Sequence, residues 1–247
     1  MKKMWFELLG AGLLSVAVGC AGEPEGMNLS TELEAIVGGT KVTGLPAVGV
    51  ILQDGQTSCT GTLIAPRTVL TAGHCVDPRF TDPSRMSFGI GSSIAGLQYE
   101  IQVSDAQPHP DYYYDGHSIQ GDIGLLYLAK DAPVAPMAFN RATMSASWVG
   151  KTLLFVGFGL SDGFNQTGDG IKRAVQIPVT GVFADRFRFQ AQGKSTCMGD
   201  SGGPAFALDE DGNLVVVGVT SSSLSPTCSS WVEDTRVDVY QDFVESD

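Results

Sequence analysis

The segment Gly199-Asp-Ser-Gly-Gly-Pro204 is the most informative stretch of this sequence of 247 residues. A nucleophilic serine needs a tight, exposed turn that a substrate carbonyl group can approach closely, and flanking glycines permit the backbone angles of such a turn. The backbone N–H groups of Gly199 and Ser201 would then converge to hold a developing oxyanion. The alternative is a glycine-rich hairpin with an incidental serine. We interpret Ser201 as a nucleophile.

The sequence has three histidines that could act as a base for this serine. His74 lies in Val69-Leu-Thr-Ala-Gly-His-Cys75, at the end of an apolar run, and taken alone it is better explained as a core histidine. His109 and His117 lie in polar, turn-like segments and are expected at the surface. Asp122 directly precedes another apolar run, where it is either a turn residue or a buried group that orients a histidine.

The composition favours a globular all-β protein. Hydrophobic residues make up 43% of the chain and charged residues 17%, with 31 glycines and 12 prolines. Short apolar runs broken by Gly, Pro, Asp and Ser predict strands joined by tight turns. Strands are expected over residues 48–52, 61–64, 68–72, 123–128, 153–158, 174–179, 204–208 and 214–220, and a short helix over 237–244.

A proline-containing bridge over residues 131–136 separates two strand-rich halves. This predicts two packed β-barrels over about 36–135 and 136–235, followed by a C-terminal helix over about 236–246. Ligand sites prefer such interfaces, so a site between the barrels would draw residues from both.

The first 20 residues resemble a signal peptide, because a basic start precedes an apolar stretch too short to span a membrane. Ala17-Val-Gly-Cys20 resembles a bacterial lipobox, and acylation of Cys20, ordinary cleavage nearby and a bystander cysteine remain three open interpretations. Residues 21–35 are polar and acidic, which predicts a pro-segment or linker. We expect a secreted protein, tethered to the envelope if Cys20 is lipidated.

The formal net charge of −12 makes nucleic acid an improbable partner, because an acidic surface repels phosphate groups. The five cysteines permit disulfides in an exported chain, and the sequence alone leaves several pairings open.

Four segments occur in the order found in the chymotrypsin-like serine proteases, and the chain resembles this family from Ile36 to about Val244. They are Ile36-Val-Gly-Gly39, Thr71-Ala-Gly-His-Cys75, Asp122-Ile-Gly-Leu-Leu126 and Gly199-Asp-Ser-Gly-Gly-Pro204. The resemblance implies two six-stranded Greek-key barrels with a short C-terminal helix. It implies a serine endopeptidase that acts as a monomer on proteins or peptides, without metal or organic cofactor.

The resemblance also assigns roles to particular residues. Ser201 would be the nucleophile, His74 its base and Asp122 the group that orients the imidazole, with Gly199 and Ser201 forming the oxyanion hole. Ser221 matches the serine that supports the aspartate, and the segment that begins there would pair with the substrate backbone. Disulfides Cys59–Cys75 and Cys197–Cys228 match two bridges of the family, and the lack of further bridges fits a bacterial secreted member.

The specificity pocket departs from the trypsin-like pattern. Ser195 stands at the pocket floor, where trypsin-like enzymes carry aspartate, and Thr196 and Ser223 add hydroxyl groups to the wall. Without a carboxylate we expect a small or medium apolar residue before the scissile bond. Either Glu233 or Asp234 reaching the pocket would instead restore a preference for basic residues.

The family resemblance further implies a zymogen. Cleavage before Ile36 by an activating protease would free an ammonium group that pairs with Asp200. Two alternatives to a peptidase remain: a catalytically silent homologue that serves as a binding protein, and an esterase.

Overall fold

The computed structural model describes residues 36–223 and 225–246. The expected signal peptide over residues 1–20, its Cys20 and the expected pro-segment over residues 21–35 therefore lie outside the described residues. None of the helices in the described part of the chain is long and apolar enough to cross a membrane.

Barrel one is a closed antiparallel barrel of six strands, in the order β2-β3-β4-β9-β6-β5. Short connections rich in turn residues join its strands. The buried apolar side chains of the strands point inward and fill the interior of the barrel. The strands are β2 (Val48–Gln53), β3 (Gln56–Ala65), β4 (Thr68–Thr71), β5 (Met86–Gly91), β6 (Leu97–Pro108) and β9 (Gly124–Leu128).

Barrel two contains the remaining long strands, in the order β11-β10-β13-β14-β15-β12, and the pairing of β11 with β12 closes it. The short strand β1 (Thr40–Lys41) pairs with the start of β11, at Arg173 and Ala174, whereas β12 pairs with its other end, from Val179 to Val182. The barrel strands are β10 (Thr152–Gly157), β11 (Arg173–Val182), β12 (Arg186–Phe189), β13 (Pro204–Leu208), β14 (Leu214–Ser223) and β15 (Val232–Arg236).

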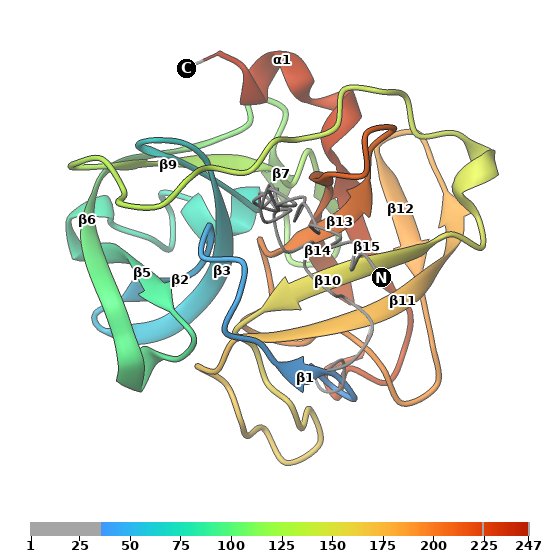
Figure 1. Cartoon of the computed structure of the whole chain (residues 1–247), viewed down its shortest axis with the longest axis horizontal. Helices are drawn as coiled ribbons and strands as arrows, with labels where there is room; N and C mark the ends of the chain where they lie inside the picture. The colour runs from blue at the N-terminus through green and yellow to red at the C-terminus, as the bar shows by residue number, and fades with distance from the viewer. Residues whose placement is uncertain (1–35, 224, 247) are drawn as a thin grey trace, which may run out of the picture. The chain divides into compact units, whose positions relative to one another are not determined.

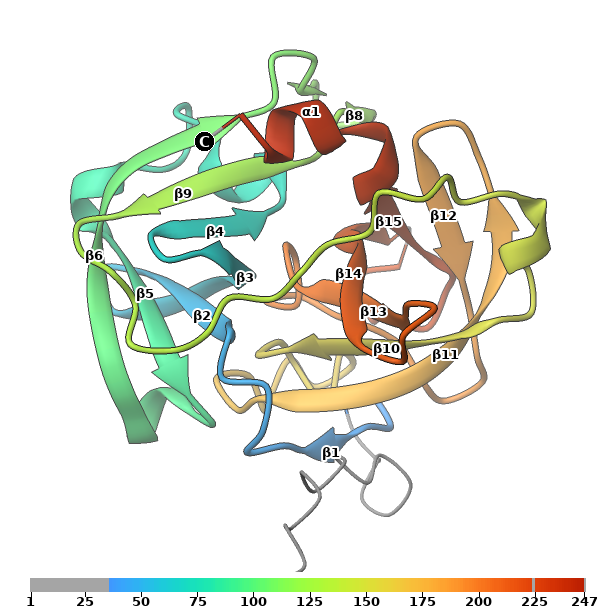
Figure 2. The ribbon, with the colours of Figure 1, turned by 45° about the horizontal axis from the view of Figure 1, so that its top comes forward.

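The two barrels lie side by side, and the connection between β9 and β10 runs along both of them (Figure 1, Figure 2). Phe158, which follows β10 of barrel two, packs against Val50 and Leu52 of barrel one. The predicted all-β fold of two six-stranded barrels is therefore confirmed, and so are the eight strands expected from the sequence.

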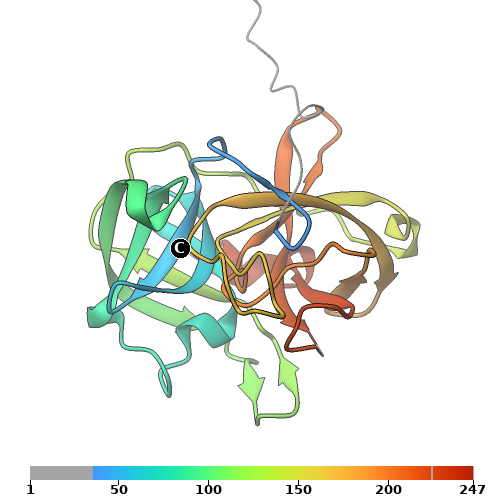
Figure 3. The ribbon, with the colours of Figure 1, turned by 90° about the horizontal axis from the view of Figure 1, so that it is seen from below.

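Short elements complete the fold. The 3-10 turns are Gly73–Val76, Pro83–Arg85, Ile94–Gly96, Ala146–Trp148 and Val237–Val239. The C-terminal helix α1 spans Gln241–Val244 only, after the last of these turns. The strands β7 (Tyr113–Tyr114) and β8 (Ile119–Gln120) form a separate hairpin that projects from barrel one (Figure 3).

Candidate active site

A cleft of about 670 Å³ contains both His74 and Ser201. The first lies in the 3-10 turn that follows β4 of barrel one, and the second lies just before β13 of barrel two. The cleft is therefore built at the junction of the barrels, as the sequence predicts. Other residues that line it include Phe80, Tyr112, Tyr114, His117, Thr196, Cys197, Met198, Thr220, Ser221, Ser222, Ser223, Cys228 and Val232.

Asp122 holds His74 through both its backbone and its ring. The His74 N–H donates to Asp122 Oδ1 at 2.8 Å, and His74 Nδ1 lies 2.9 Å from Asp122 Oδ2. The carboxylate is buried, with 2% of its surface exposed, whereas the imidazole side chain keeps 28% exposed. The aspartate thus fixes the Nδ1 edge of the ring, and in the described part of the chain no hydrogen bond engages the other ring nitrogen, Nε2.

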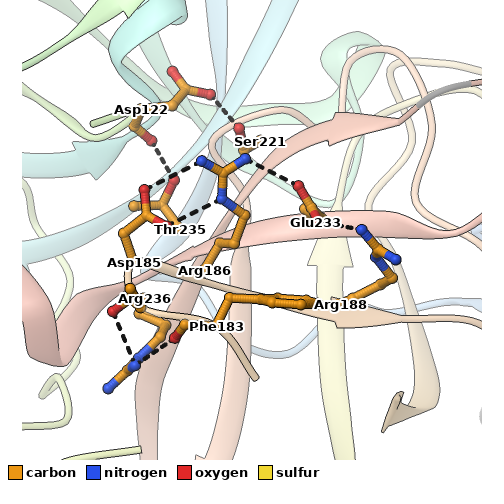
Figure 4. Close-up of polar contacts among 10 residues, drawn as sticks. Asp122, Phe183, Asp185, Arg186, Arg188, Ser221, Glu233, Thr235 and Arg236 are labelled. Carbon is orange, nitrogen blue, oxygen red and sulfur yellow. Dashed lines mark hydrogen bonds and ion pairs between the residues drawn. The ribbon is translucent and has the colours of Figure 1, made fainter. Parts of the chain in front are cut away.

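Two hydroxyl groups fix Asp122 in turn (Figure 4). Ser221 Oγ donates to Asp122 Oδ2 at 2.5 Å, and Thr235 Oγ1 donates to the Asp122 carbonyl oxygen at 2.8 Å. Ser221 was identified from the sequence. Thr235 was not, because its contact joins residues 113 positions apart and no local pattern marks it.

The electrostatics of this pair favour an ionised carboxylate. Burial opposes ionisation of Asp122, but the charge and hydrogen bonds of His74 and the Ser221 hydroxyl lower its pKa below its ordinary value. Burial likewise opposes protonation of His74, but the charge and hydrogen bond of Asp122 raise its pKa above the ordinary value. A raised pKa makes the imidazole a stronger base toward the proton of a nearby hydroxyl group.

The loop that carries Ser201 is anchored to both barrels. The Ser201 carbonyl accepts from the Thr60 N–H of β3 at 2.8 Å, and the Gly202 N–H donates to the Thr220 carbonyl of β14 at 2.7 Å. Gly202 has φ +79°, and a Cβ there would lie 2.0 Å from Thr71 Oγ1, so only glycine fits this position. Among the described residues no hydrogen bond joins the Ser201 hydroxyl to His74, and in empty sites such bonds are often long.

Two backbone N–H groups, one in the turn over Cys197–Asp200 and one directly after it, are unused donors. Gly199 has φ +91°, and the Asp200 N–H donates to the Cys197 carbonyl at 2.9 Å, which is the geometry of a type II turn. Within the described chain no acceptor binds the N–H of Gly199 or of Ser201. Two such free donors beside a nucleophile are what an oxyanion hole requires.

Thr60 braces this turn and was missed from the sequence. Its hydroxyl donates to the Gly199 carbonyl at 2.8 Å and accepts from the Phe158 N–H at 3.1 Å. The first contact spans 139 positions of the chain and links the two barrels, so nothing in the sequence near Thr60 could reveal it. The contact turns the Gly199 carbonyl toward barrel one.

Asp200 is buried directly behind this turn. Its Oδ1 accepts from the Gly159 N–H and its Oδ2 from the Cys197 N–H, each at 2.8 Å. Burial raises its pKa to about 7, against the opposing effects of these bonds and of the Arg173 charge.

The segment that begins at Ile36 docks onto the floor of the predicted pocket. Ile36 is buried in the core of barrel two with 1% of its surface exposed. The next residue, Val37, forms an antiparallel bridge with Ser195, with both N···O distances 3.2 Å.

The predicted pocket residues separate into two groups. Thr196, Ser221 and Ser223 line the cleft, whereas Ser195 does not. Ser195 is 3% exposed, and its hydroxyl donates to the Thr196 carbonyl at 2.8 Å. The floor hydroxyl expected from the sequence is therefore turned away from the cleft.

Two disulfides pair as expected. Cys59 is bonded to Cys75 beside the His74 turn, and Cys197 is bonded to Cys228 in the wall of the cleft. Of the other histidines, His117 is exposed, as expected, and is among the residues that line the cleft, but His109 was wrongly expected at the surface. It packs edge-on against Tyr240 and Phe243 at the C-terminal helix, which covers most of its ring.

Two closed six-stranded barrels with a cleft at their junction define a chymotrypsin-like fold. Residues 36–244 match the family model described as Trypsin, and the chain belongs to this family of serine proteases.

Relatives of known name agree with this family. The chain is 34% identical over 218 residues to "Serine protease Hayan" of Drosophila melanogaster, covering 76% of this chain and 34% of that protein. It is 29% identical over 229 residues to "Brachyurin" of Leptuca pugilator, covering 85% and 97%. It is 28% identical over 192 residues to "Trypsin" of Saccharopolyspora erythraea, covering 70% and 79%. The chain thus spans about a third of the length of Hayan and nearly all of brachyurin.

Proposed function

We propose that this protein is a serine endopeptidase that hydrolyses peptide bonds through an acyl-enzyme intermediate. The observation that carries the proposal is the hydrogen-bonded series Ser221–Asp122–His74, which meets Ser201 and two unused backbone donors in one cleft. Each group has the chemistry that one step of acyl transfer needs.

In the first step Ser201 Oγ attacks the carbonyl carbon of the substrate, and His74 Nε2 takes the hydroxyl proton. The N–H groups of Gly199 and Ser201 stabilise the oxyanion that forms on the carbonyl oxygen. Asp122 keeps the Nδ1 proton in place and stabilises the imidazolium without being protonated. The C–N bond then breaks, and His74 passes its proton to the leaving amine.

In the second step a water molecule repeats the sequence on the acyl-enzyme. His74 takes a proton from the water, the hydroxide attacks the ester carbonyl, and Ser201 leaves with the proton from His74. The substrate backbone adds as a strand along Ser221–Ser223, at the end of β14 that lines the cleft.

We also propose that the protein is exported and made as a zymogen. Cleavage after Ala35 would free the Ile36 ammonium group. This group would supply a positive charge that pairs with the buried Asp200. Support comes from the docking of Ile36 in barrel two and from the raised pKa of Asp200. An activating protease tolerant of small residues, or the enzyme itself, would make this cut. If Cys20 is lipidated, the cut also releases the domain from its membrane anchor.

The test is hydrolysis of a mixed peptide library by the chain beginning at Ile36 and by its Ser201→Ala variant. We expect cleavage by the first protein and a loss of several orders of magnitude in the second, with the same thermal unfolding. Binding of peptides without cleavage would instead indicate a silent homologue. Turnover of simple esters alone would indicate an esterase.

A further inference from the structure

Asp234 has no adequate partner for its carboxyl group. Its side chain is fully buried, and neither of its oxygens makes a hydrogen bond among the described residues. The hydroxyl group of Thr220, its cross-strand neighbour in β14, acts against the effect of burial on the pKa of the Asp234 carboxyl. Burial raises the pKa of the Asp234 carboxyl well above its ordinary value. A buried group of this kind is costly unless something pairs with it.

The neighbouring carboxylate, Glu233, is fully engaged elsewhere. It accepts from Arg186 Nη1 at 3.2 Å and from Arg188 Nη2 at 2.8 Å on β12 (Figure 4). Successive residues of a strand point to opposite faces, so Asp234 points the other way, into barrel two. Of the two acidic residues left open by the sequence, only Asp234 faces the pocket side of β15.

The position of Asp234 can be fixed from its neighbours in the sheet. Val232 lies two residues earlier on the same face of β15, and Thr220 lies directly opposite in β14, and both line the cleft. At roughly 3.3 Å per residue, Asp234 lies about 7 Å further along the strand than Val232. A Cβ at Gly218 would lie 3.1 Å from Asp234 Oδ2, which places this oxygen inside barrel two.

A second buried oxygen without a partner lies in the same wall. Thr196 is 2% exposed and lines the cleft, and its Oγ1 has no hydrogen-bond partner in the described part of the chain. Thr196 Oγ1 thus lies in the wall of the cleft, and the Asp234 carboxyl lies behind that wall, next to Thr220; among the described residues that line the cleft there is no lysine or arginine. Such a site is complementary to a long side chain with a positively charged, hydrogen-donating end.

We propose that Asp234 is the specificity-determining carboxylate of this site, selecting lysine or arginine immediately before the scissile bond. This inference rests on the proposed peptidase function. The stem of the substrate side chain packs against Val232 and the Cys197–Cys228 disulfide. Its charged end then meets the carboxylate of Asp234, directly or through a bridging water. Each charge supplies the partner that the other lacks.

This assignment changes the preference expected from Ser195. The counter-charge comes from β15 rather than from the segment before the nucleophile, so the absence of aspartate at Ser195 does not exclude basic substrates. A short apolar side chain would fill only the outer part of the pocket and leave Asp234 without a partner.

The experiment compares peptides that differ only in the residue before the cut: lysine, arginine, norleucine, leucine and alanine. Norleucine matches the lysine stem without its ammonium group. We expect kcat/KM for lysine or arginine to exceed that for norleucine at least tenfold in the chain beginning at Ile36. Asp234→Asn should reduce this ratio to below about two while norleucine cleavage stays within about threefold. The matched control Glu233→Gln should keep the wild-type ratio.

Each result separates the inference from the function on which it rests. Failure of the wild-type enzyme to cleave any of the peptides would refute the proposed function. Cleavage with a lysine-to-norleucine ratio near or below one, or a high ratio that survives Asp234→Asn, would overturn the role of Asp234. Should Asp234→Asn fail to fold, inhibition of wild-type norleucine cleavage by benzamidine decides: competitive inhibition supports a cation site, and its absence refutes one.

Discussion

Replacing Asp122 with asparagine tests how the site holds His74 in its reactive form. The aspartate side chain now accepts from three donors: the His74 N–H, His74 Nδ1 and Ser221 Oγ, at 2.8, 2.9 and 2.5 Å. Asparagine keeps one acceptor oxygen and introduces an NH₂ group that can only donate. If the oxygen keeps the His74 N–H, the NH₂ group faces Nδ1. The ring must then carry its proton on Nε2 and cannot accept one from Ser201.

The expected loss follows from this wrong tautomer. In a related serine protease the same exchange lowers kcat about 10⁴-fold, which corresponds to about 5 kcal/mol at roughly 1.4 kcal/mol per factor of ten. We expect a loss of similar size in kcat for Asp122→Asn, with little change in thermal unfolding. The kcat values are calculated per mole of folded enzyme. The control is Asp185→Asn, which removes a partly exposed ion pair to Arg186 worth at most about 1 kcal/mol. If Asp122→Asn kept more than a tenth of wild-type kcat, Asp122 would not be setting the tautomer of His74.

Three further predictions follow from the same contacts. Because the pKa of His74 is raised above 6.5 and only the neutral imidazole accepts a proton, kcat/KM for a neutral peptide should rise with pH through a value above 6.5; a profile flat from pH 5 to 9 would contradict this. In the uncleaved chain the folded pKa of Asp200 is about 7 against 3.8. The folded state therefore binds the proton more tightly, and unfolding free energy should fall as pH rises from about 4 to about 7, by on the order of 4 kcal/mol. Denaturant titrations should lose this slope in Asp200→Asn. Replacing both Cys197 and Cys228 with alanine opens a loop with a sequence separation of 31 residues. It should lower unfolding free energy by about 3 to 4 kcal/mol in urea titrations, and an unchanged value would contradict the loop-entropy argument.

Strand periodicity and turn residues were sufficient to predict the strands with continuous apolar runs. They were not sufficient for β15, Val232–Arg236, whose sequence VEDTR is mostly charged although every residue is buried. Its burial depends on tertiary partners: Glu233 binds two arginines of β12, and Arg236 donates to the Phe183 and Ala184 carbonyls (Figure 4). No local pattern encodes such pairing, because the partners lie far away in the chain.

In the candidate site too, some residues can be predicted from local sequence, whereas others depend on partners far away in the chain. Motifs singled out His74, Asp122 and Ser201 as candidates, because each lies in a short segment with a distinctive order of residues. Thr60 and Thr235 act through hydrogen bonds to backbone carbonyls of distant segments, and only the folded barrels bring these atoms together.

In the proposed mechanism Ser201 is a nucleophile that His74 activates. The most direct measurement is labelling of the chain beginning at Ile36 with a fluorophosphonate, followed by mass spectrometry of the modified peptide. We expect one equivalent of label per chain, attached to Ser201, and none in the Ser201→Ala variant. A folded protein that takes up no label, or one labelled at a different serine, would contradict it.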